Sequence, residues 1–102
     1  MTVELLWWDG CPSHPEALAE LERILREEGV SAAVRRVEVE DDDQARRERF
    51  PGSPTIRING EDIAPAESEP YSLTCRIYRR RDGRVSPTPD PEDVRDAVRR
   101  AA

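Results

Sequence analysis

A short apolar run that leads directly into an amphipathic helix pattern restricts the fold of this chain more than any other feature. Residues 3–8 are almost entirely apolar, which predicts a short strand inside a mixed α/β sheet. The turn signal Asp9-Gly10 follows, and from residue 17 to 25 apolar side chains recur at helical spacing on one face. The sequence therefore predicts a strand, a tight turn and a helix, with Cys11 at the junction.

Both ends of this helix carry typical sequence signals. Ser13 and Glu16 have the spacing of a capping box, and Pro15 suits the first turn. Gly29 is typical of a helix C-terminus, because glycine adopts the left-handed conformation without strain. We therefore expect the helix to lie between Ser13 and Gly29.

The following residues continue the α/β pattern. Residues 32–39 have the alternating polarity of a second strand, which the intervening helix should place parallel to the first. Residues 41–50 predict a short polar helix that opens with three acidic residues. Ala45 and Phe50 are its expected inward contacts.

A β-hairpin is predicted next. Residues 56–58 alternate in polarity and run into Asn59-Gly60, the strongest two-residue hairpin signal. Residues 61–63 should therefore return antiparallel to the preceding strand.

The last third of the chain is less regular. Residues 64–72 are rich in Pro and Glu and are predicted to form a loop. Residues 73–81 have strand character and end at the turn signal Asp82-Gly83. A final helix should begin at Asp90 or Pro91. Its expected inward residues are Val94, Ala97 and Val98.

Length and charge limit the possible functions. The 102 residues are enough for a single domain, residues 1–102, with one core. A formal net charge of -6 and a pI near 4.8 argue against a nucleic-acid-binding surface or a membrane-surface helix, since both need clustered positive charge. No window has membrane-spanning length and no signal peptide is evident, so we expect a cytoplasmic protein. Two cysteines in that compartment are more often free, catalytic or redox-switching than permanently bridged.

Two motifs, in this order and spacing, resemble the thioredoxin-like superfamily. The first is Trp-Trp-Asp-Gly-Cys-Pro-Ser-His, residues 7–14, where that family carries an aromatic residue and a Cys-x-x-Cys pair at a strand-to-helix junction. The second is Gly-Ser-Pro-Thr, residues 52–55, where the family has a cis-proline facing the active cysteine. The resemblance covers roughly residues 3–63 and the terminal helix. It implies a thioredoxin-like α/β fold with a central mixed sheet of about four strands flanked by about three helices.

The resemblance also implies roles for particular residues. Pro54 should be cis, which would leave the Ser53 backbone free to pair with an extended thiol substrate beside Cys11; the alternative is an ordinary trans turn. Ser53, Pro54 and Thr55 are thus candidate substrate-binding residues. Trp8 is expected at the rim of the core, with substrate stacking as the second interpretation.

One departure from the family pattern changes the expected chemistry. His14 occupies the position of the second active cysteine, so the motif is Cys-x-x-His and dithiol exchange within it is excluded. The chain is most similar to small bacterial thioredoxin-like proteins that share a Cys-Pro-x-His start and a late Ser/Thr-Cys-Arg segment. Some of these are loosely associated with mercury-handling genes.

Cys11 is the first candidate for chemistry. A cysteine just before a helix has its thiolate stabilised by free backbone N–H groups and the helix dipole, so a lowered pKa is expected. His14 could add charge stabilisation or proton transfer, whereas Asp9 would act in the opposite direction. The structural alternatives are a small buried apolar residue for Cys11 and a helix-start residue without a catalytic role for His14.

The position of Cys75 depends on which segment completes the hairpin. If residues 61–63 form the paired strand, the following loop can bring Cys75 near Cys11 as a resolving thiol. If residues 75–81 form that strand instead, Cys75 begins at the opposite end and is a core residue. We favour proximity, because a monothiol Cys-x-x-His protein gains a complete redox or metal-binding cycle from a second thiol.

Three functional hypotheses follow. The leading one is a thiol–disulfide redox protein, an oxidoreductase of the monothiol type, with Cys11 as nucleophile, His14 tuning it and Cys75 resolving the mixed disulfide. The second is a soft-metal carrier, for example for mercury, with ligands Cys11, Cys75 and Asp9; too few ligands are available for structural zinc. The third is an interaction module that has lost the chemistry. We expect no cofactor, a small thiol or a protein thiol or disulfide as partner, and a monomer or weak dimer.

Overall fold

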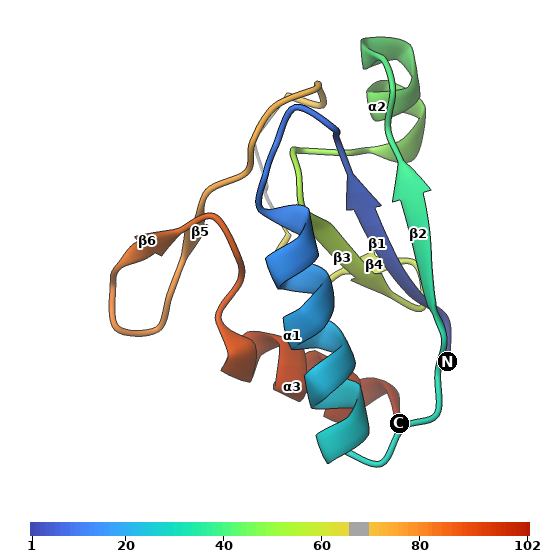
Figure 1. Ribbon diagram of the computed structural model, residues 1–102, viewed down its shortest axis with the longest axis vertical. Helices are drawn as coiled ribbons and strands as arrows, with labels where there is room; N and C mark the ends of the chain where they lie inside the picture. Colours follow the sequence, from blue (N-terminus) through green and yellow to red (C-terminus); the bar gives the residue numbers. More distant parts are fainter. Residues whose placement is uncertain (66–69) are drawn as a thin grey trace.

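The computed structural model describes residues 1–65 and 70–102, which form a sheet packed against helices (Figure 1). In chain order the elements are β1 (Val3–Trp7), α1 (His14–Glu27), β2 (Val34–Glu38), α2 (Asp42–Glu48), β3 (Thr55–Ile58), β4 (Glu61–Asp62), β5 (Tyr78–Arg79), β6 (Val85–Ser86) and α3 (Pro91–Ala101).

The main sheet has four strands in the order β2-β1-β3-β4. β1 pairs parallel to β2 on one side and antiparallel to β3 on the other, and β4 pairs antiparallel to β3. The predicted interior position of the first strand and its parallel pairing with the second are therefore confirmed. The prediction of a mixed α/β fold with a sheet of four strands and three helices is also confirmed.

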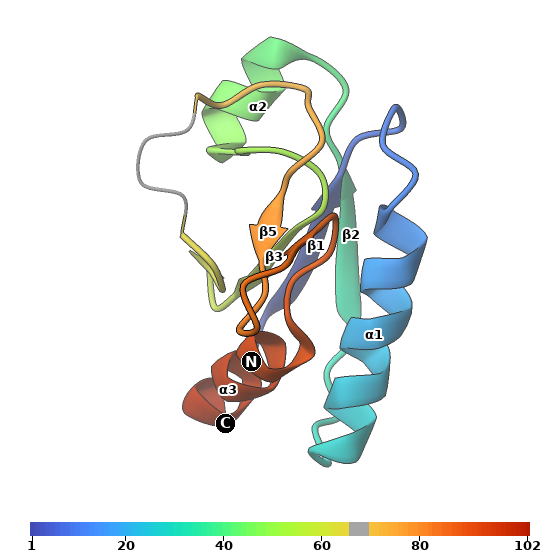
Figure 2. The same ribbon diagram turned by 90° about the vertical axis from the view of Figure 1, so that its left-hand side faces the viewer.

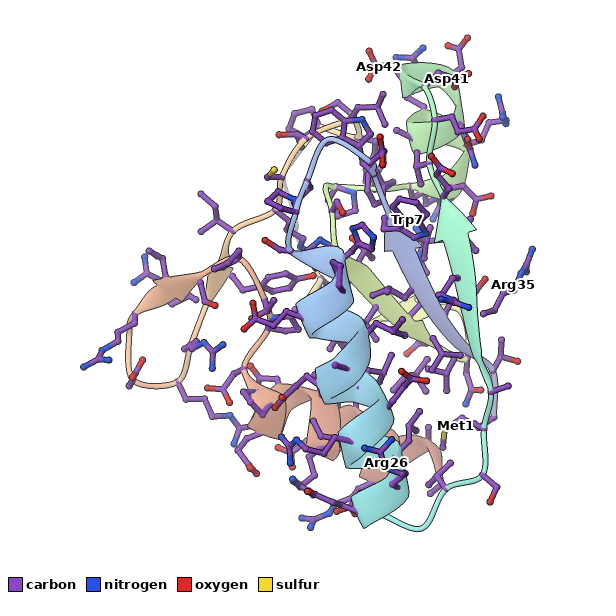
Figure 3. All side chains as sticks on the ribbon, viewed as in Figure 1. Met1, Trp7, Arg26, Arg35, Asp41 and Asp42 are labelled. Carbon is purple, nitrogen blue, oxygen red and sulfur yellow. The ribbon has the colours of Figure 1, made fainter. Side chains whose placement is uncertain are left out.

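Side chains that alternate along β1 reach the two faces of the sheet. Leu5 packs in a core cluster with buried residues of α1, β3 and α3, whereas Leu6 packs in a second cluster with Ala45 and Phe50 beside α2. Figures 1 and 2 show this arrangement, with α1 and α3 on one side of the sheet and α2 near the end of β1 and β2. Figure 3 shows side chains filling the space between α1, α3 and the sheet. The predicted inward residues of the second and third helices are buried.

The hairpin between β3 and β4 forms as predicted. Asn59 and Gly60 have φ angles of 53° and 83°, and the strands beside them pair Ile58 with Glu61. Two successive positive φ angles are the signature of a type I′ turn, whose twist matches that of the strands.

The capping box predicted at the start of α1 is absent. Ser13 is the N-cap residue, but its backbone is already in the helical region (φ -89°, ψ -9°), and its side chain makes no capping hydrogen bond. A capping side chain reaches the free N–H groups best from an extended N-cap backbone, as Asp41 does at α2, where it accepts from the N–H of Gln44 at 2.7 Å. Figure 3 labels Asp41 at that helix start.

The prediction of a strand over residues 73–81 is mostly wrong. Only Tyr78–Arg79 is a strand, and it pairs with Val85–Ser86 across the predicted Asp82-Gly83 turn in a hairpin separate from the main sheet. The residues before it make a single bridge, between Ser53 and Cys75. Of the loop predicted over residues 64–72, residues 66–69 lie outside the described part of the chain.

No helix in the described ranges is both long and apolar enough to cross a membrane.

Candidate functional site

Cys11 lies in the tight connection between β1 and α1. Its backbone N–H donates to the carbonyl of Trp8 at 3.0 Å, which closes the turn. Gly10 permits the turn because a Cβ atom there would lie 2.3 Å from the Trp8 ring, so the indole packs directly on the glycine. The Cys11 side chain is almost completely buried, at 1% exposure. Its direct contact with solvent is therefore minimal.

Hydrogen bonds favour the ionised form of Cys11 despite this burial. Burial by itself raises the pKa of the thiol, but the N–H of Ser13 lowers it, followed by the Cys75 thiol. The hydroxyls of Ser13 and Ser53 act in the same direction, and the pKa of Cys11 is lower than its ordinary value as a result. His14 and Asp9, which the sequence suggested as the controlling charges, are not among these largest influences in the described part of the chain.

The Ser53–Pro54 peptide bond is cis, as predicted. Ser53 lies opposite Cys11, whose thiol donates to the Ser53 carbonyl oxygen at an Sγ–O distance of 3.4 Å. The Ser53 hydroxyl also accepts from the backbone N–H of Trp8 at 3.0 Å. Ser53 is thus bonded to both ends of the turn that carries Cys11.

The expectation that the Ser53 backbone is free to pair with a substrate is wrong. Its N–H donates to the carbonyl of Thr74 at 2.8 Å, and its carbonyl accepts from the N–H of Arg76 at 2.9 Å. Residues 74–76 therefore run parallel to Ser53 as a one-bridge ladder with Cys75 at its centre. Ser53, Pro54 and Thr55 are all buried, so these predicted substrate-binding residues have no exposed surface to offer.

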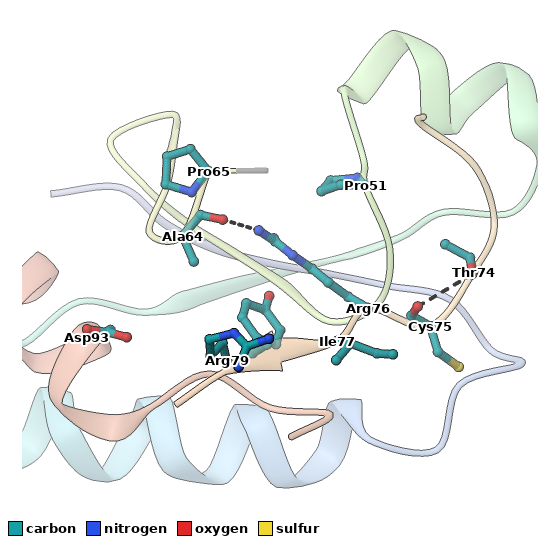
Figure 4. Close-up of a pocket in the computed structure, with 10 residues that line it drawn as sticks. Pro51, Ala64, Pro65, Thr74, Cys75, Arg76, Ile77, Arg79 and Asp93 are labelled. Carbon is teal, nitrogen blue, oxygen red and sulfur yellow. Dashed lines mark hydrogen bonds between the residues drawn. The ribbon is translucent and has the colours of Figure 1, made fainter. Parts of the chain in front are cut away.

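This pairing brings Cys75 to Cys11. Both cysteines are free thiols, but Cys75 is exposed whereas Cys11 is buried. The pKa of Cys75 is raised, chiefly by the interaction of its thiol with the neighbouring Cys11, with burial and the negative charge of Cys11 adding to the effect. In Figure 4 the Cys75 sulfur points toward the connection between β1 and α1. Of the two predicted locations for Cys75, the structure has the one beside Cys11.

A buried arginine next to Cys75 anchors the segment. Arg76 is 7% exposed and donates to Asp62 at 2.8 Å, to the Thr55 hydroxyl at 3.2 Å and to the Ala64 carbonyl. Its guanidinium carbon also lies 4.5 Å from the centre of the Tyr78 ring. Removing one partner of a buried ion pair typically costs about 3–5 kcal/mol, so this network holds the Cys75 segment firmly.

Further bonds fix the two sides of the segment. Before Cys75, the N–H of Leu73 donates to the Asp42 carboxylate at 3.0 Å. After it, the buried Tyr78 hydroxyl donates to the carbonyl of Pro54, and burial raises the pKa of that phenol. In the sequence, only the family resemblance points to the Cys-Arg pair, residues 75 and 76. Arg76 is one of 16 basic residues, and its neighbours in the sequence give no signal that it is buried. Its partner Asp62 is too distant in sequence for the ion pair to be predicted.

Gly52 allows the two segments to approach. Its φ of +144° is a conformation that favours glycine, and a Cβ atom there would lie 3.0 Å from Cβ and 3.1 Å from Cα of Arg76. The Gly-Ser-Pro-Thr motif therefore contains a close backbone contact as well as the cis bond.

The other predicted site residues surround the turn. The His14 ring stacks on Trp7 at a centroid distance of 4.2 Å, and its Nδ1 lies 3.2 Å from the Cys11 carbonyl oxygen. A carbonyl can only accept, so this bond requires a proton on Nδ1. Trp8 packs against the cluster beside α2, in agreement with the expected position at the rim of the core, and Asp9 is exposed.

A three-ligand metal site is not formed in the part of the chain that the structure describes. Residues 1–65 and 70–102 contain no group of three or more His, Cys, Asp or Glu side chains able to share one metal ion. The predicted set of Cys11, Cys75 and Asp9 is therefore reduced to the two thiols.

A surface cleft lies on the other side of the Cys75 backbone. It has a volume of about 480 Å³, and its lining includes Pro51, Pro65, Ile77 and Arg79 (Figure 4). The cleft borders the backbone of Cys75, while the sulfur points out of it toward the turn that carries Cys11. The Cys75 sulfur consequently lies beside the cleft.

Comparisons with family models, curated proteins and solved structures return no match to this chain.

Gly52→Ala should destabilise the protein more than Gly29→Ala. Gly29 also has a positive φ, of +70°, but a Cβ atom there meets nothing within 4 Å. We expect the control to lose about 1–2 kcal/mol of unfolding free energy from backbone strain alone. Gly52→Ala adds the overlap with Arg76 and should lose more, measured by urea unfolding. An equal or smaller loss would contradict the close approach of the two segments.

Cys75→Ala should raise the pKa of Cys11 by removing a donor to its thiolate, whereas Cys75→Ser retains a donor and should raise it less. The ultraviolet absorbance of the thiolate, recorded against pH, gives the pKa of Cys11 in both variants. Because the pKa of folded Cys11 is lowered, its thiolate stabilises the fold fully above the ordinary thiol pKa. That contribution disappears as the pH falls through the lowered value. An unchanged transition in Cys75→Ala would show that the thiols do not interact.

Proposed function

We propose that this chain is a thiol–disulfide redox protein in which Cys11 and Cys75 form the redox pair. The observation that carries the proposal is that two free thiols lie close together beside Ser53. The pKa of Cys11 is lowered, and the pKa of Cys75 is raised because of its neighbour Cys11. Opposite shifts of this kind are typical of sites where one thiolate is prepared to react.

We further propose that the fold is thioredoxin-like. Support comes from the order of β1, α1, β2, α2, β3 and β4, with β1 parallel to β2 and antiparallel to β3. The cis Ser53–Pro54 bond opposite a cysteine at a helix start adds to this. The second thiol, however, comes from a distant segment and not from the helix start, where His14 stands.

In this proposal Cys11 is the internal nucleophile. When Cys75 carries a mixed disulfide with a small thiol, the Cys11 thiolate attacks the Cys75 sulfur, the bond to the small thiol breaks, and that thiol leaves as a thiolate. His14 acts as a positioning residue, because its bond to the Cys11 carbonyl and its stacking on Trp7 fix the turn.

The wild-type protein should form an internal disulfide under mild oxidation. Incubation with oxidised glutathione, followed by acid quenching and intact-mass measurement, should show the loss of two hydrogens and of both titratable thiols. Cys11→Ser and Cys75→Ser are matched controls, and neither can close the bridge. A wild-type protein that keeps both thiols free while its folded state is intact would contradict the redox function.

The same pair supports a second candidate function, the binding of a thiophilic metal ion as cargo. Two thiolates are sufficient for a linear soft-metal site, and the described residues offer no third ligand of the usual types beside them. His14 and Asp9 take no part in this version.

Titration of the reduced protein with mercuric ion should then show one tight equivalent, followed by the ultraviolet absorption of the metal–thiolate bond. Cys75→Ser should weaken this binding by orders of magnitude, because a hydroxyl is a poor ligand for a soft ion. Binding of equal strength in the wild type and in Cys75→Ser would exclude the two-thiol metal site.

A further inference from the structure

The two thiols of the proposed pair differ sharply in their access to solvent. Cys11 is 1% exposed, and its thiol lies against the Ser53 carbonyl. Cys75 is exposed on the outer segment. A sulfur atom must approach another in line with the bond that breaks, so an external reactant can reach Cys75 and is blocked from Cys11.

The backbone that an extended peptide would use is also occupied. Addition of a peptide strand requires free N–H and C=O groups at the edge it joins. The N–H and C=O of Ser53 are already bonded to Thr74 and Arg76 of the same chain. Residues 74–76 thus stand where a peptide substrate would pair, and their own cysteine faces Cys11.

Displacing this segment would break its other attachments. Arg76 would lose Asp62 and Thr55, and Tyr78 would lose its bond to Pro54. An incoming peptide would have to replace several buried polar contacts at once, whereas a small disulfide needs access only to Cys75, which is exposed.

We propose that external exchange takes place at Cys75 and that the exchanging molecules are small thiols and disulfides rather than extended peptides. This inference rests on the proposed Cys11–Cys75 redox pair. It reverses the order predicted from the sequence, in which Cys11 reacts first and Cys75 resolves.

The steps balance as follows. Cys75 passes its proton to the neighbouring Cys11 thiolate and attacks one sulfur of a small disulfide. A Cys75 mixed disulfide forms, and the first small thiolate leaves and takes up the proton from Cys11. Cys11 then attacks the Cys75 sulfur, and the second small thiolate leaves. The two protein thiols lose two electrons and two protons, and these appear on two small thiols. In reverse, a small thiolate attacks Cys75 and Cys11 leaves as the thiolate.

The ionisation of the two thiols supports the reverse step. A thiol with a lowered pKa is the better leaving group, and Cys11 is the member of the pair whose pKa is lowered. Burial, substrate access and leaving-group ability therefore all assign the internal role to Cys11.

The test uses the full-length protein with oxidised glutathione as the probe, rapid acid quenching and peptide mapping. Cys11→Ser should accumulate a glutathione adduct on Cys75, because no second thiol is present to remove it. Cys75→Ser should form the Cys11 adduct at least roughly tenfold more slowly than Cys11→Ser forms the Cys75 adduct. Circular dichroism confirms that each variant is folded, and Cys11→Ala and Cys75→Ala provide a second pair.

Early quenching of the wild type gives the same information without substitution, since the transient adduct should lie on Cys75. Adducts on Cys11 in the wild type, or equally fast reaction of Cys75→Ser, would overturn the inference. If the wild type still forms the internal disulfide in that case, the redox function stands and only the order is wrong. If it forms no internal disulfide, the proposed function itself fails.

The substrate class is tested by comparing wild-type oxidation by glutathione disulfide with oxidation by an extended peptide whose cysteine carries a glutathione disulfide. The small disulfide should react faster. A faster reaction with the peptide would contradict the occupied Ser53 edge, and Arg76→Ala, which loosens the segment, should reduce the difference between the two substrates.

Discussion

Both sides of the candidate site are held by the hydrogen bonds of one buried residue, Ser53. Its hydroxyl accepts from the backbone of Trp8 and its carbonyl accepts from the Cys11 thiol, which fixes the turn between β1 and α1. Its N–H and carbonyl also bond Thr74 and Arg76, which fixes the segment of Cys75. Each of these groups is buried, so losing a partner would leave an unsatisfied polar atom in the interior. The two cysteines are therefore brought together by backbone geometry that depends little on their own chemistry.

This arrangement separates two requirements that a single thiol meets poorly. A strongly stabilised thiolate needs directed hydrogen bonds, which are easiest to supply in a buried position, whereas exchange with outside molecules needs access. Cys11 has the hydrogen bonds and Cys75 has the access. In the proposed cycle, electrons pass between small thiols in solution and Cys11 through Cys75.

The parts of the fold that depend on neighbouring residues were predictable from the sequence. β1 follows from a continuous apolar run, α1 and α3 follow from apolar periodicity, and the turn at Asn59 follows from the conformations that its residues permit. The cis bond before Pro54 was expected only through the family resemblance. The capping box failed because the same residues suit a helix whose N-cap backbone is already helical, and spacing alone does not distinguish the two cases.

The remainder of the site depends on contacts between residues distant in sequence. The burial of Arg76 depends on Asp62, 14 residues away, and the pairing of Cys75 with Ser53 spans the segment between them. Residues 73–77 have strand-like composition, but the single bridge they form gives no periodic pattern. Sequence patterns could therefore name the two cysteines as candidates without deciding which of them faces solvent.

The most direct test of a Cys11–Cys75 redox pair is its equilibrium with glutathione. The folded protein is incubated in defined mixtures of reduced and oxidised glutathione, quenched in acid and mapped by peptide mass. The account predicts a single oxidised species, with Cys11 joined to Cys75 in one chain, whose ratio to the reduced form follows the oxidised glutathione concentration divided by the square of the reduced concentration. Glutathione that stays attached to either cysteine across the whole range, with no internal disulfide, would contradict it.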